Sequence, residues 1–256
     1  GIVFVPSPKA SQNSLLYKLM SKKLAEKGYV VLTINLRGYG KSEEPKKLET
    51  ASDLNFTKDI ENAVTFLKEN KRVDKIYIIS HSFATIFAVT EGINDARVNK
   101  LIALSPPLQP FLSERYLAQN MTQERKLKEA EGFMKYSHLS QEIELSLIQE
   151  LIKENNIENY ISKNSTKPFL IANGELETEE QLINAKNFVR NAKRVKLITW
   201  KGVGHYYGLE SQPSGNFYLF INDKLIDFKK SSIVIKDTSI INPFIEEITH
   251  WLQNEK

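Results

Sequence analysis

The chain of 256 residues contains no cysteine, which excludes disulfide bridges, a catalytic thiol and thiolate metal sites. It also lacks a marked excess of one charge, because 35 Lys and Arg face 31 Asp and Glu, for a formal net charge of +4. The basic residues are scattered rather than gathered into a block, so we expect no nucleic-acid partner. No apolar run reaches the roughly 20 residues that a membrane-spanning helix needs, and no membrane span is expected.

What remains is the composition of an ordinary globular protein, with 41% hydrophobic and 26% charged residues. No secretory signal pattern opens the sequence. The chain starts at Gly1 within an apolar run instead of at a methionine, as expected of a processed or trimmed N-terminus. The lack of cysteine does not fix the compartment, although a cytoplasmic location is favoured.

Short apolar segments alternate with helical patterns along most of the chain. Short β-rich or apolar runs predict strands at 2–5, 29–34, 75–79, 98–104, 167–172 and 195–200, and the run at 29–34 is continuously apolar. Apolar residues at helical spacing predict helices at 14–27, 57–70, 84–91, 179–191 and 243–253. In the second of these helices, the inward positions are expected to be Ile60, Val64, Phe66 and Leu67. Strands that alternate with helices predict an α/β fold, in which a mainly parallel sheet carries helices on both faces.

A polar, helix-rich segment at 108–165 interrupts this alternation. It separates a core of residues 1–107 from a second core part at 166–256. Because it follows a strand at the carboxyl edge of the sheet, we expect it to form a helical cap over that edge. Its apolar residues, among them Phe133 and Met134, should then face a pocket or the sheet domain.

A second interruption lies at 212–239, where two β-rich runs at 217–221 and 232–235 predict a hairpin. Asn222-Asp223 is a turn signal. A two-stranded ribbon on its own is marginal in water. The hairpin should therefore pack on the cap, extend the sheet edge or pair with a second subunit, which would give a homodimer.

The segment Tyr77-Ile-Ile-Ser-His-Ser82-Phe-Ala-Thr-Ile-Phe87 runs from a predicted strand into a predicted helix. This is the setting of a nucleophile elbow, usually Gly-x-Ser-x-Gly, whose turn needs small residues two places before and after the serine. Ser80 and Ala84 hold those places, so the spacing is kept although the glycines are not. The motif alone is weak, because a polar turn after a strand is common.

Two further loops supply the groups that an elbow serine needs. A serine hydroxyl requires a base, and Gly202-Val-Gly-His205 places a histidine in a flexible loop after the last core strand. A third group should orient the imidazole, and Asn173-Gly-Glu-Leu-Glu177 offers carboxylates after the preceding strand. All three sites follow the carboxyl ends of parallel strands, where open α/β sheets bind ligands.

Together these stretches resemble the α/β-hydrolase superfamily over most of the chain outside the two insertions. The matching stretches are Asn35-Leu-Arg-Gly-Tyr-Gly-Lys-Ser42, Ile78-Ile-Ser-His-Ser82-Phe-Ala84, Leu104-Ser-Pro-Pro107, Asn173-Gly-Glu-Leu-Glu177 and Gly202-Val-Gly-His205. The first strand resembles the third strand of the family. The resemblance implies a three-layer α/β-hydrolase fold with a cap and an activity of the serine esterase, lipase, thioesterase or aminopeptidase kind. It also implies a small-molecule acyl substrate and no metal or organic cofactor.

The resemblance implies a catalytic triad of Ser82 as nucleophile, His205 as base and Glu177 as acid. Glu177 stands where the family usually has Asp, and Glu175 and Glu179 are close enough to remain alternatives for this role. For the oxyanion hole, the amide of Phe83 is one expected donor.

The second oxyanion donor is harder to place. The family has His-Gly-x after the strand that corresponds to 2–5, whereas this chain has Val5-Pro6-Ser7-Pro8-Lys9. Prolines have no N–H group. Ser7 or Lys9 is therefore expected to donate through its N–H, and otherwise the hole is incomplete.

Further residues are candidates for the wall of a substrate pocket: His81, Tyr206, Phe133 and Met134. The favoured hypothesis is a cofactor-free serine hydrolase that cleaves an ester, thioester or amide. The alternative is a catalytically silent member of the fold that binds a small molecule or a protein partner. Pro8, Ser80 and the late insertion favour the alternative, while the intact serine, histidine and acid favour the enzyme.

Overall fold

The computed structural model describes residues 1–7, 15–70, 73–108, 139–140, 142–143, 146–147, 157–158, 161, 166–205, 207, 210–211, 217–221, 224–227 and 241–254. Its centre is one sheet of six parallel strands in the order β2-β1-β3-β4-β5-β6. The strands are β1 Ile2–Val5, β2 Val31–Thr33, β3 Ile76–His81, β4 Val98–Leu104, β5 Phe169–Gly174 and β6 Val195–Trp200. The predicted parallel α/β fold is therefore confirmed.

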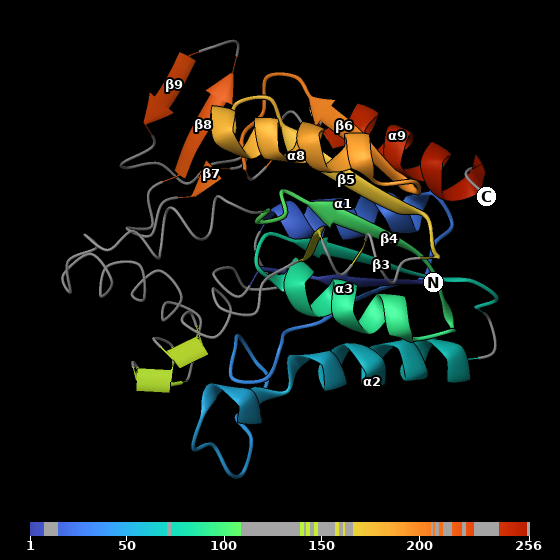
Figure 1. Cartoon of the computed structure of the whole chain (residues 1–256), viewed down its shortest axis with the longest axis vertical. Coiled ribbons are helices and arrows are strands. Elements are labelled where there is room, and N and C mark those ends of the chain that lie inside the picture. Colours follow the sequence, from blue (N-terminus) through green and yellow to red (C-terminus); the bar gives the residue numbers. More distant parts are fainter. Residues whose placement is uncertain are drawn as a thin grey trace.

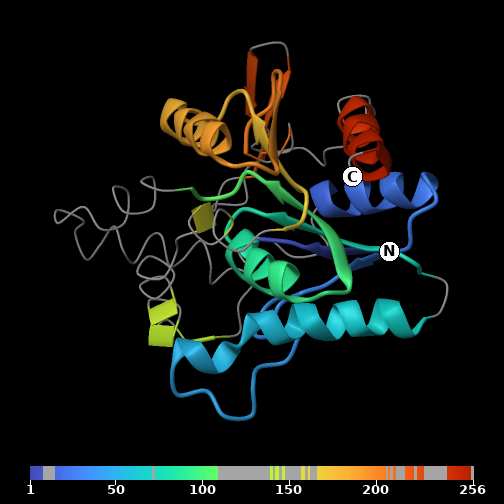
Figure 2. The same ribbon diagram turned by 45° about the vertical axis from the view of Figure 1, so that its right-hand side comes forward.

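Helices cover both faces of this sheet (Figures 1 and 2). They are α1 Leu15–Glu26, α2 Phe56–Glu69, α3 Ala84–Asn94, α8 Glu179–Asn191 and α9 Ile241–Asn254, with a short 3-10 helix η1 at Ala51–Leu54. Buried residues of α1 and α9 form one core cluster, and those of α2, α3 and α8 form the other. None of the described helices is long and apolar enough to cross a membrane.

The strand β1 shows how the sequence builds two cores from one sheet. Successive side chains of a strand point to opposite faces. Ile2 and Phe4 accordingly belong to the α1–α9 cluster, while Val3 and Val5 belong to the α2–α3 cluster. All four residues are fully buried, which is why the run is continuously apolar instead of alternating.

One expectation for α2 is wrong. Ile60, Val64 and Leu67 are buried as predicted, but Phe66 is 59% exposed. At 3.6 residues per turn, position 66 lies on the face opposite to position 64, and the buried positions 60, 63, 64 and 67 already fill the inward stripe.

The strand order creates a topological switch point between β1 and β3. From β1 the chain moves outward to β2, then returns to place β3 on the other side of β1. In open α/β sheets, ligands bind outside the carboxyl ends of the strands at such a point. The register Val5↔Ser80 brings the loop after β1 beside the elbow after β3.

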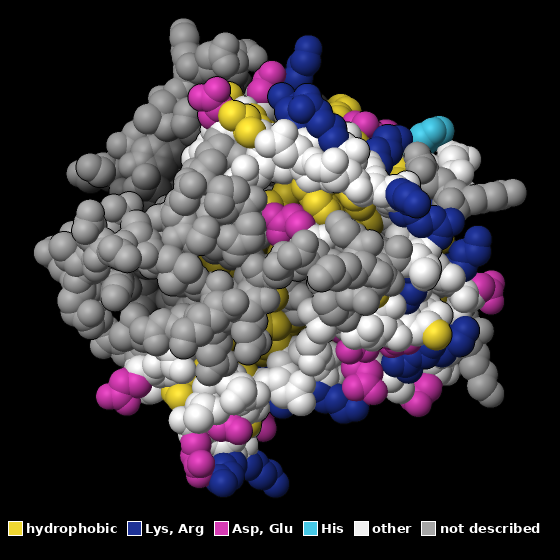
Figure 3. Space-filling view, in the orientation of Figure 1, with side chains coloured by type: hydrophobic (Ala, Val, Ile, Leu, Met, Phe, Trp, Pro, Cys, Tyr) yellow, Lys and Arg dark blue, Asp and Glu magenta, His cyan; other side chains and the backbone are white. Residues whose placement is uncertain are grey.

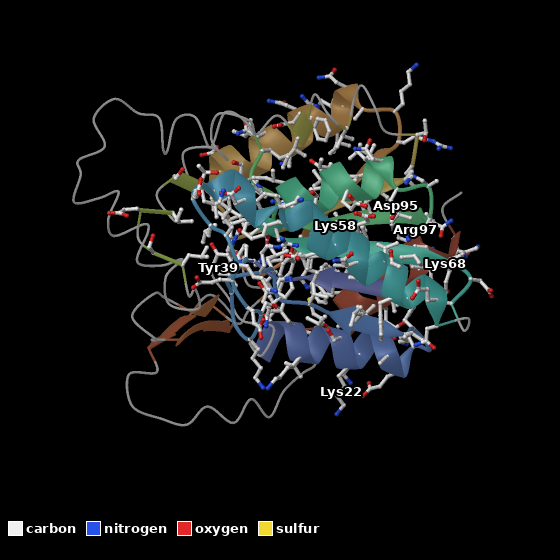
Figure 4. The ribbon with its side chains drawn as sticks, turned by 90° about the horizontal axis from the view of Figure 1, so that it is seen from below. Lys22, Tyr39, Lys58, Lys68, Asp95 and Arg97 are labelled. Carbon is white, nitrogen blue, oxygen red and sulfur yellow. The ribbon has the colours of Figure 1, made fainter. Side chains whose placement is uncertain are left out.

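Charged side chains hold connections at the surface of the fold. The guanidinium of Arg37, in the loop after β2, donates two hydrogen bonds to Asp59 of α2, at 2.7 and 2.9 Å. Arg97 pairs with Asp95 and also donates to Thr65 at 2.8 Å, which ties the end of α3 to α2. In Figure 4, Asp95 and Arg97 lie beside each other, on the opposite side of the view from Tyr39. Figure 3 shows charges of both signs scattered over the described part of the face in view, in keeping with the modest net charge.

Only a few residues of the expected cap are described, and Phe133 and Met134 lie outside them. Leu139, Leu147, Ile157 and Ile161 are buried and belong to the α2–α3 cluster. A Cβ atom on Gly38 would lie 2.5 Å from the Leu139 side chain. Since Gly38 follows β2, this contact brings the segment to the carboxyl edge of the sheet. A cap over that edge remains our proposal for 108–165.

The late insertion forms a small antiparallel sheet, visible at the upper left of Figure 1. Strand β8 Phe217–Ile221 pairs with β7 Glu210–Ser211 on one side and with β9 Lys224–Asp227 on the other. The pairing Ile221↔Lys224 leaves a two-residue connection where the turn signal was recognised. The expected partner run 232–235 lies outside the described residues, and β9 takes the place beside β8.

Candidate active site

Ser82 occupies the turn between β3 and α3 with a left-handed backbone, φ 54°. Such a conformation is strained for a non-glycine residue and is characteristic of a nucleophile elbow. The small neighbours are buried as the turn requires, Ser80 at 2% and Ala84 at 0% exposure. The N–H of Ser82 donates to Leu104 O at 2.8 Å, which fixes the elbow against the end of β4.

His205 reaches the elbow from the loop after β6. Its Nε2 lies 3.0 Å from Ser82 Oγ, within hydrogen-bond distance. The two residues are 123 positions apart in the sequence, so the fold alone brings them together. A neutral imidazole whose Nε2 accepts from the serine hydroxyl can act as a general base toward it.

The turn after β5 is docked on the loop of His205 through backbone contacts. Glu175 N–H donates to Trp200 O at 2.8 Å, and Leu176 N–H donates to Val203 O at 2.9 Å. A Cβ atom on Gly174 would lie 2.3 Å from Val203 O and 2.5 Å from Gly204 O. Only glycine permits this approach, which positions the segment immediately before His205.

The carboxylate of Glu177 is buried at this turn, where the residue is 9% exposed. Oε1 accepts hydrogen bonds from Ser105 Oγ at 2.5 Å and from Gly174 N–H at 2.9 Å, and Oε2 accepts from Asn173 Nδ2 at 2.9 Å. His205 is not among these donors. Burial raises the pKa of Glu177 above its ordinary value, although the three hydrogen bonds act in the opposite direction.

Glu175 and Glu179, the alternative candidates for the acid, lie at the surface or in the next helix instead of in the buried turn. Glu175 is exposed, and its Oε2 accepts from Gly202 N–H at 3.0 Å, so it supports the histidine loop from outside. Glu179 is the first residue of α8. Among these three carboxylates, Glu177 is the buried one, and its role as the acid remains a prediction.

His81 is fully buried and connects the two sides of the site. Tyr17 Oη donates to its Nδ1 at 2.8 Å, and its Nε2 donates to the backbone oxygen of His205 at 2.9 Å. Burial lowers the pKa of His81 from 6.5 to about 4, so the ring is neutral at pH 7, as this hydrogen-bond pattern requires. We call Tyr17, His81 and the carbonyl of His205 the Tyr17–His81 relay. His81 thus supports the loop that carries His205, and its place in the wall of a substrate pocket remains a prediction.

The three expected oxyanion donors, Phe83, Ser7 and Lys9, have different outcomes in the structure. Phe83 follows Ser82 as the N-cap residue of α3, and its role as an oxyanion donor remains a prediction. The N–H of Ser7 donates to Tyr17 Oη at 3.1 Å, so in this structure Tyr17 already holds the amide that we expected in the oxyanion hole. Lys9 lies outside the described residues, as does the pocket candidate Tyr206.

The roles of three residues of the site were not recognised from the sequence. Tyr17 is one of several apolar positions of α1, and nothing in its spacing marks its hydroxyl as a partner of His81. Ser105 has a left-handed backbone with φ 49° and donates to Glu177. Tyr207 donates to Ala172 O at 2.6 Å and stacks on Phe244. The Leu104-Ser-Pro-Pro107 stretch was the only signal, and it marked the place of Ser105 without its role.

A parallel sheet that presents a serine at a strained strand–helix elbow, with a histidine from a later loop bonded to it, has the architecture of the α/β hydrolases. The family model described as alpha/beta hydrolase fold matches residues 11–197, well over half of the chain. The chain therefore belongs to the α/β-hydrolase family. No curated protein matches the sequence.

Solved structures of esterases share this fold at low sequence identity. Est1E from Butyrivibrio proteoclasticus is 18% identical with a TM-score of 0.56, over 80% of this chain and 79% of that one. The esterase Pf2001 from Pyrococcus furiosus is 20% identical with a TM-score of 0.56, over 80% and 74%. A structure from work on carboxylesterases of Nitrososphaera gargenis is 17% identical with a TM-score of 0.57, over 80% and 82%. At these identities the likeness establishes the common fold.

Proposed function

We propose that this protein is a cofactor-free serine hydrolase that cleaves a carboxylic ester, thioester or amide through an acyl-enzyme on Ser82. The observation that carries the proposal is the 3.0 Å contact between Ser82 Oγ, on an elbow with φ 54°, and His205 Nε2. A backbone strain of this kind persists only where the surrounding structure maintains it, and such strain clusters at active sites.

The chemistry follows from this pair. His205 Nε2 takes the hydroxyl proton as Ser82 Oγ attacks the carbonyl carbon, and the electrons of the C=O double bond move to the oxygen. The N–H of Phe83 donates to that oxyanion. The tetrahedral intermediate then collapses, and the leaving group departs with the proton that His205 returns. Water repeats the sequence on the acyl-enzyme, releases the acid and restores Ser82.

We assign Glu177 the role of orienting His205 and stabilising its imidazolium form. The support is its burial in a turn whose backbone is docked on the histidine loop. Ser105, Asn173 and the Gly174 amide hold the carboxylate in this turn and favour its ionised form.

Esters are the preferred substrate class, because the structural neighbours that name an activity are largely esterases. One structure of Est1E holds ferulic acid, so an ester of that acid belongs in the first substrate panel. Short-chain nitrophenyl esters, an acyl thioester and an aminoacyl amide complete the panel and separate the three bond types.

The test is covalent labelling with a fluorophosphonate, followed by hydrolysis of the panel. The wild-type protein should be labelled, and both Ser82→Ala and His205→Ala should lose labelling and turnover, since members of such a unit fail together. Labelling that persists in Ser82→Ala would refute the nucleophile. A folded wild-type protein that takes no label and cleaves nothing would instead support the silent binding protein.

A further inference from the structure

The hydroxyl of Ser7 is buried and has no hydrogen-bond partner among the residues that the structure describes. Ser7 is 1% exposed, and no described group donates to or accepts from its Oγ. Folded proteins pair nearly all of their buried polar groups, and an exception calls for an explanation such as a catalytic role. Ser7 lies two residues beyond Val5, which is paired with Ser80, while Ser82 lies two residues beyond Ser80. Continuing the register places Ser7 opposite the nucleophile at the switch point.

Within residues 6–8 of this loop, one hydrogen-bond donor is left available. Pro6 and Pro8 have no N–H group. The N–H of Ser7 donates to Tyr17 Oη at 3.1 Å, and Tyr17 Oη is itself fixed by its hydrogen bond to His81. Across residues 6–8, the side-chain hydroxyl of Ser7 is therefore the remaining hydrogen-bond donor.

We propose that Ser7 supplies the second oxyanion donor through its side-chain hydroxyl, in place of a backbone amide. This inference rests on the proposed serine hydrolase activity and adds a catalytic residue to it. When Ser82 Oγ bonds to the carbonyl carbon, the oxygen gains a negative charge, and Ser7 Oγ–H and Phe83 N–H donate to it without giving up their protons. A hydrogen bond from a hydroxyl to an oxyanion is short and strong, so the interaction strengthens as the charge develops.

The Tyr17–His81 relay fixes the position of the Ser7 backbone. Tyr17 holds the backbone of Ser7, and His81 holds Tyr17 while it also holds the backbone of His205. The oxyanion loop and the base loop therefore share one buried support. A donor that is positioned before substrate arrives needs no reorganisation during the reaction, which is the condition for large electrostatic stabilisation.

The experiment compares Ser7→Ala with Ser7→Thr, which keeps a hydroxyl. In Ser7→Ala, kcat should fall about 10²- to 10³-fold with little change in KM, the effect typical of one lost oxyanion donor. Its melting temperature should stay the same or rise, because an unpaired buried hydroxyl is removed. Ser7→Thr should recover most of the lost kcat.

A trifluoromethyl ketone provides a second readout, because Ser82 adds to it and leaves an oxyanion in the same place. Its inhibition constant should weaken in Ser7→Ala by about the same factor as kcat/KM. If activity depends on Ser82 but Ser7→Ala keeps its kcat and its ketone affinity, this inference is wrong and the proposed function stands. A loss that Ser7→Thr does not restore, or that accompanies a lower melting temperature, would assign Ser7 to packing instead. A wild-type protein inactive toward every substrate and probe would overturn both.

Discussion

His81 should make the folded state sensitive to acid in a predictable range. Its pKa is about 4 in the folded protein against 6.5 for an ordinary histidine, with burial as the main cause. Between these two values the unfolded chain binds a proton at this residue and the folded protein does not. The contribution to stability is therefore fully present above pH 6.5 and is lost as the pH falls toward 4.

The magnitude follows from the same two values. A difference from 6.5 to about 4 corresponds to about 3 kcal/mol when the loss is complete, of which about 2 kcal/mol is expressed at pH 5. Among the described residues, the titratable side chains that face the ring are Tyr17, Tyr207 and His205, whose ring centroid lies 5.0 Å away.

The assay is urea unfolding at pH 7.5 and pH 5.0 for the wild-type protein and for His81→Gln. The glutamine cannot titrate, but its amide can still donate toward the carbonyl of His205. The free energy of unfolding should drop by about 2 kcal/mol more in the wild type than in the variant. Subtracting the variant removes the contributions of the carboxylates and the other histidines. Equal losses in the two proteins would show that His81 titrates normally and that the relay does not hold it neutral.

Three other predictions concern the elbow, the acid turn and the choice of acid. Ser82→Gly should be more stable to urea than Ser82→Ala by about 1 kcal/mol. Both variants lack the hydroxyl and keep the left-handed backbone at position 82, which is strained for alanine but not for glycine. Equal stabilities would mean that the elbow is unstrained. Gly174→Ala should lower kcat and the melting temperature together, since the added methyl group must displace the loop that carries His205, and a crystal structure with that loop unmoved would contradict this. Glu177→Gln should reduce kcat at least 100-fold with little change in melting temperature, whereas Glu175→Gln should keep most of the activity; the reverse result would assign the acid to Glu175.

The sequence was sufficient for the parallel sheet because burial on both faces leaves a strong local signal. Runs such as Ile2–Val5 and Ile76–Ile79 are apolar at every position, and the structure shows all of these residues buried. The elbow was likewise visible, because its turn restricts residue size at Ser80 and Ala84. The inward position predicted for Phe66 was wrong, because an apolar residue can stand outside the buried stripe of a helix.

The Tyr17–His81 relay and the unpaired hydroxyl of Ser7 could not be predicted from the sequence, for a physical reason. Hydrogen bonds between side chains of different elements depend on where those elements pack, and no local pattern encodes that placement. Tyr17 and His81 are 64 residues apart, and His81 reaches a carbonyl 124 residues further along the chain. A similar separation hid one of the three donors to Glu177, since Ser105 is 72 residues away from it.

These long separations also have a consequence for the order in which the protein folds. The relay joins segments near residues 7, 17, 81 and 205, and contacts between distant segments form late because closing long loops costs entropy first. During synthesis, the elbow can form as soon as β3 and α3 pair with β1, but the base arrives only after β6 has joined the sheet. Ser82 therefore spends the early life of each chain without His205, and under the proposed mechanism the protein becomes catalytically competent only in the last stage of its assembly.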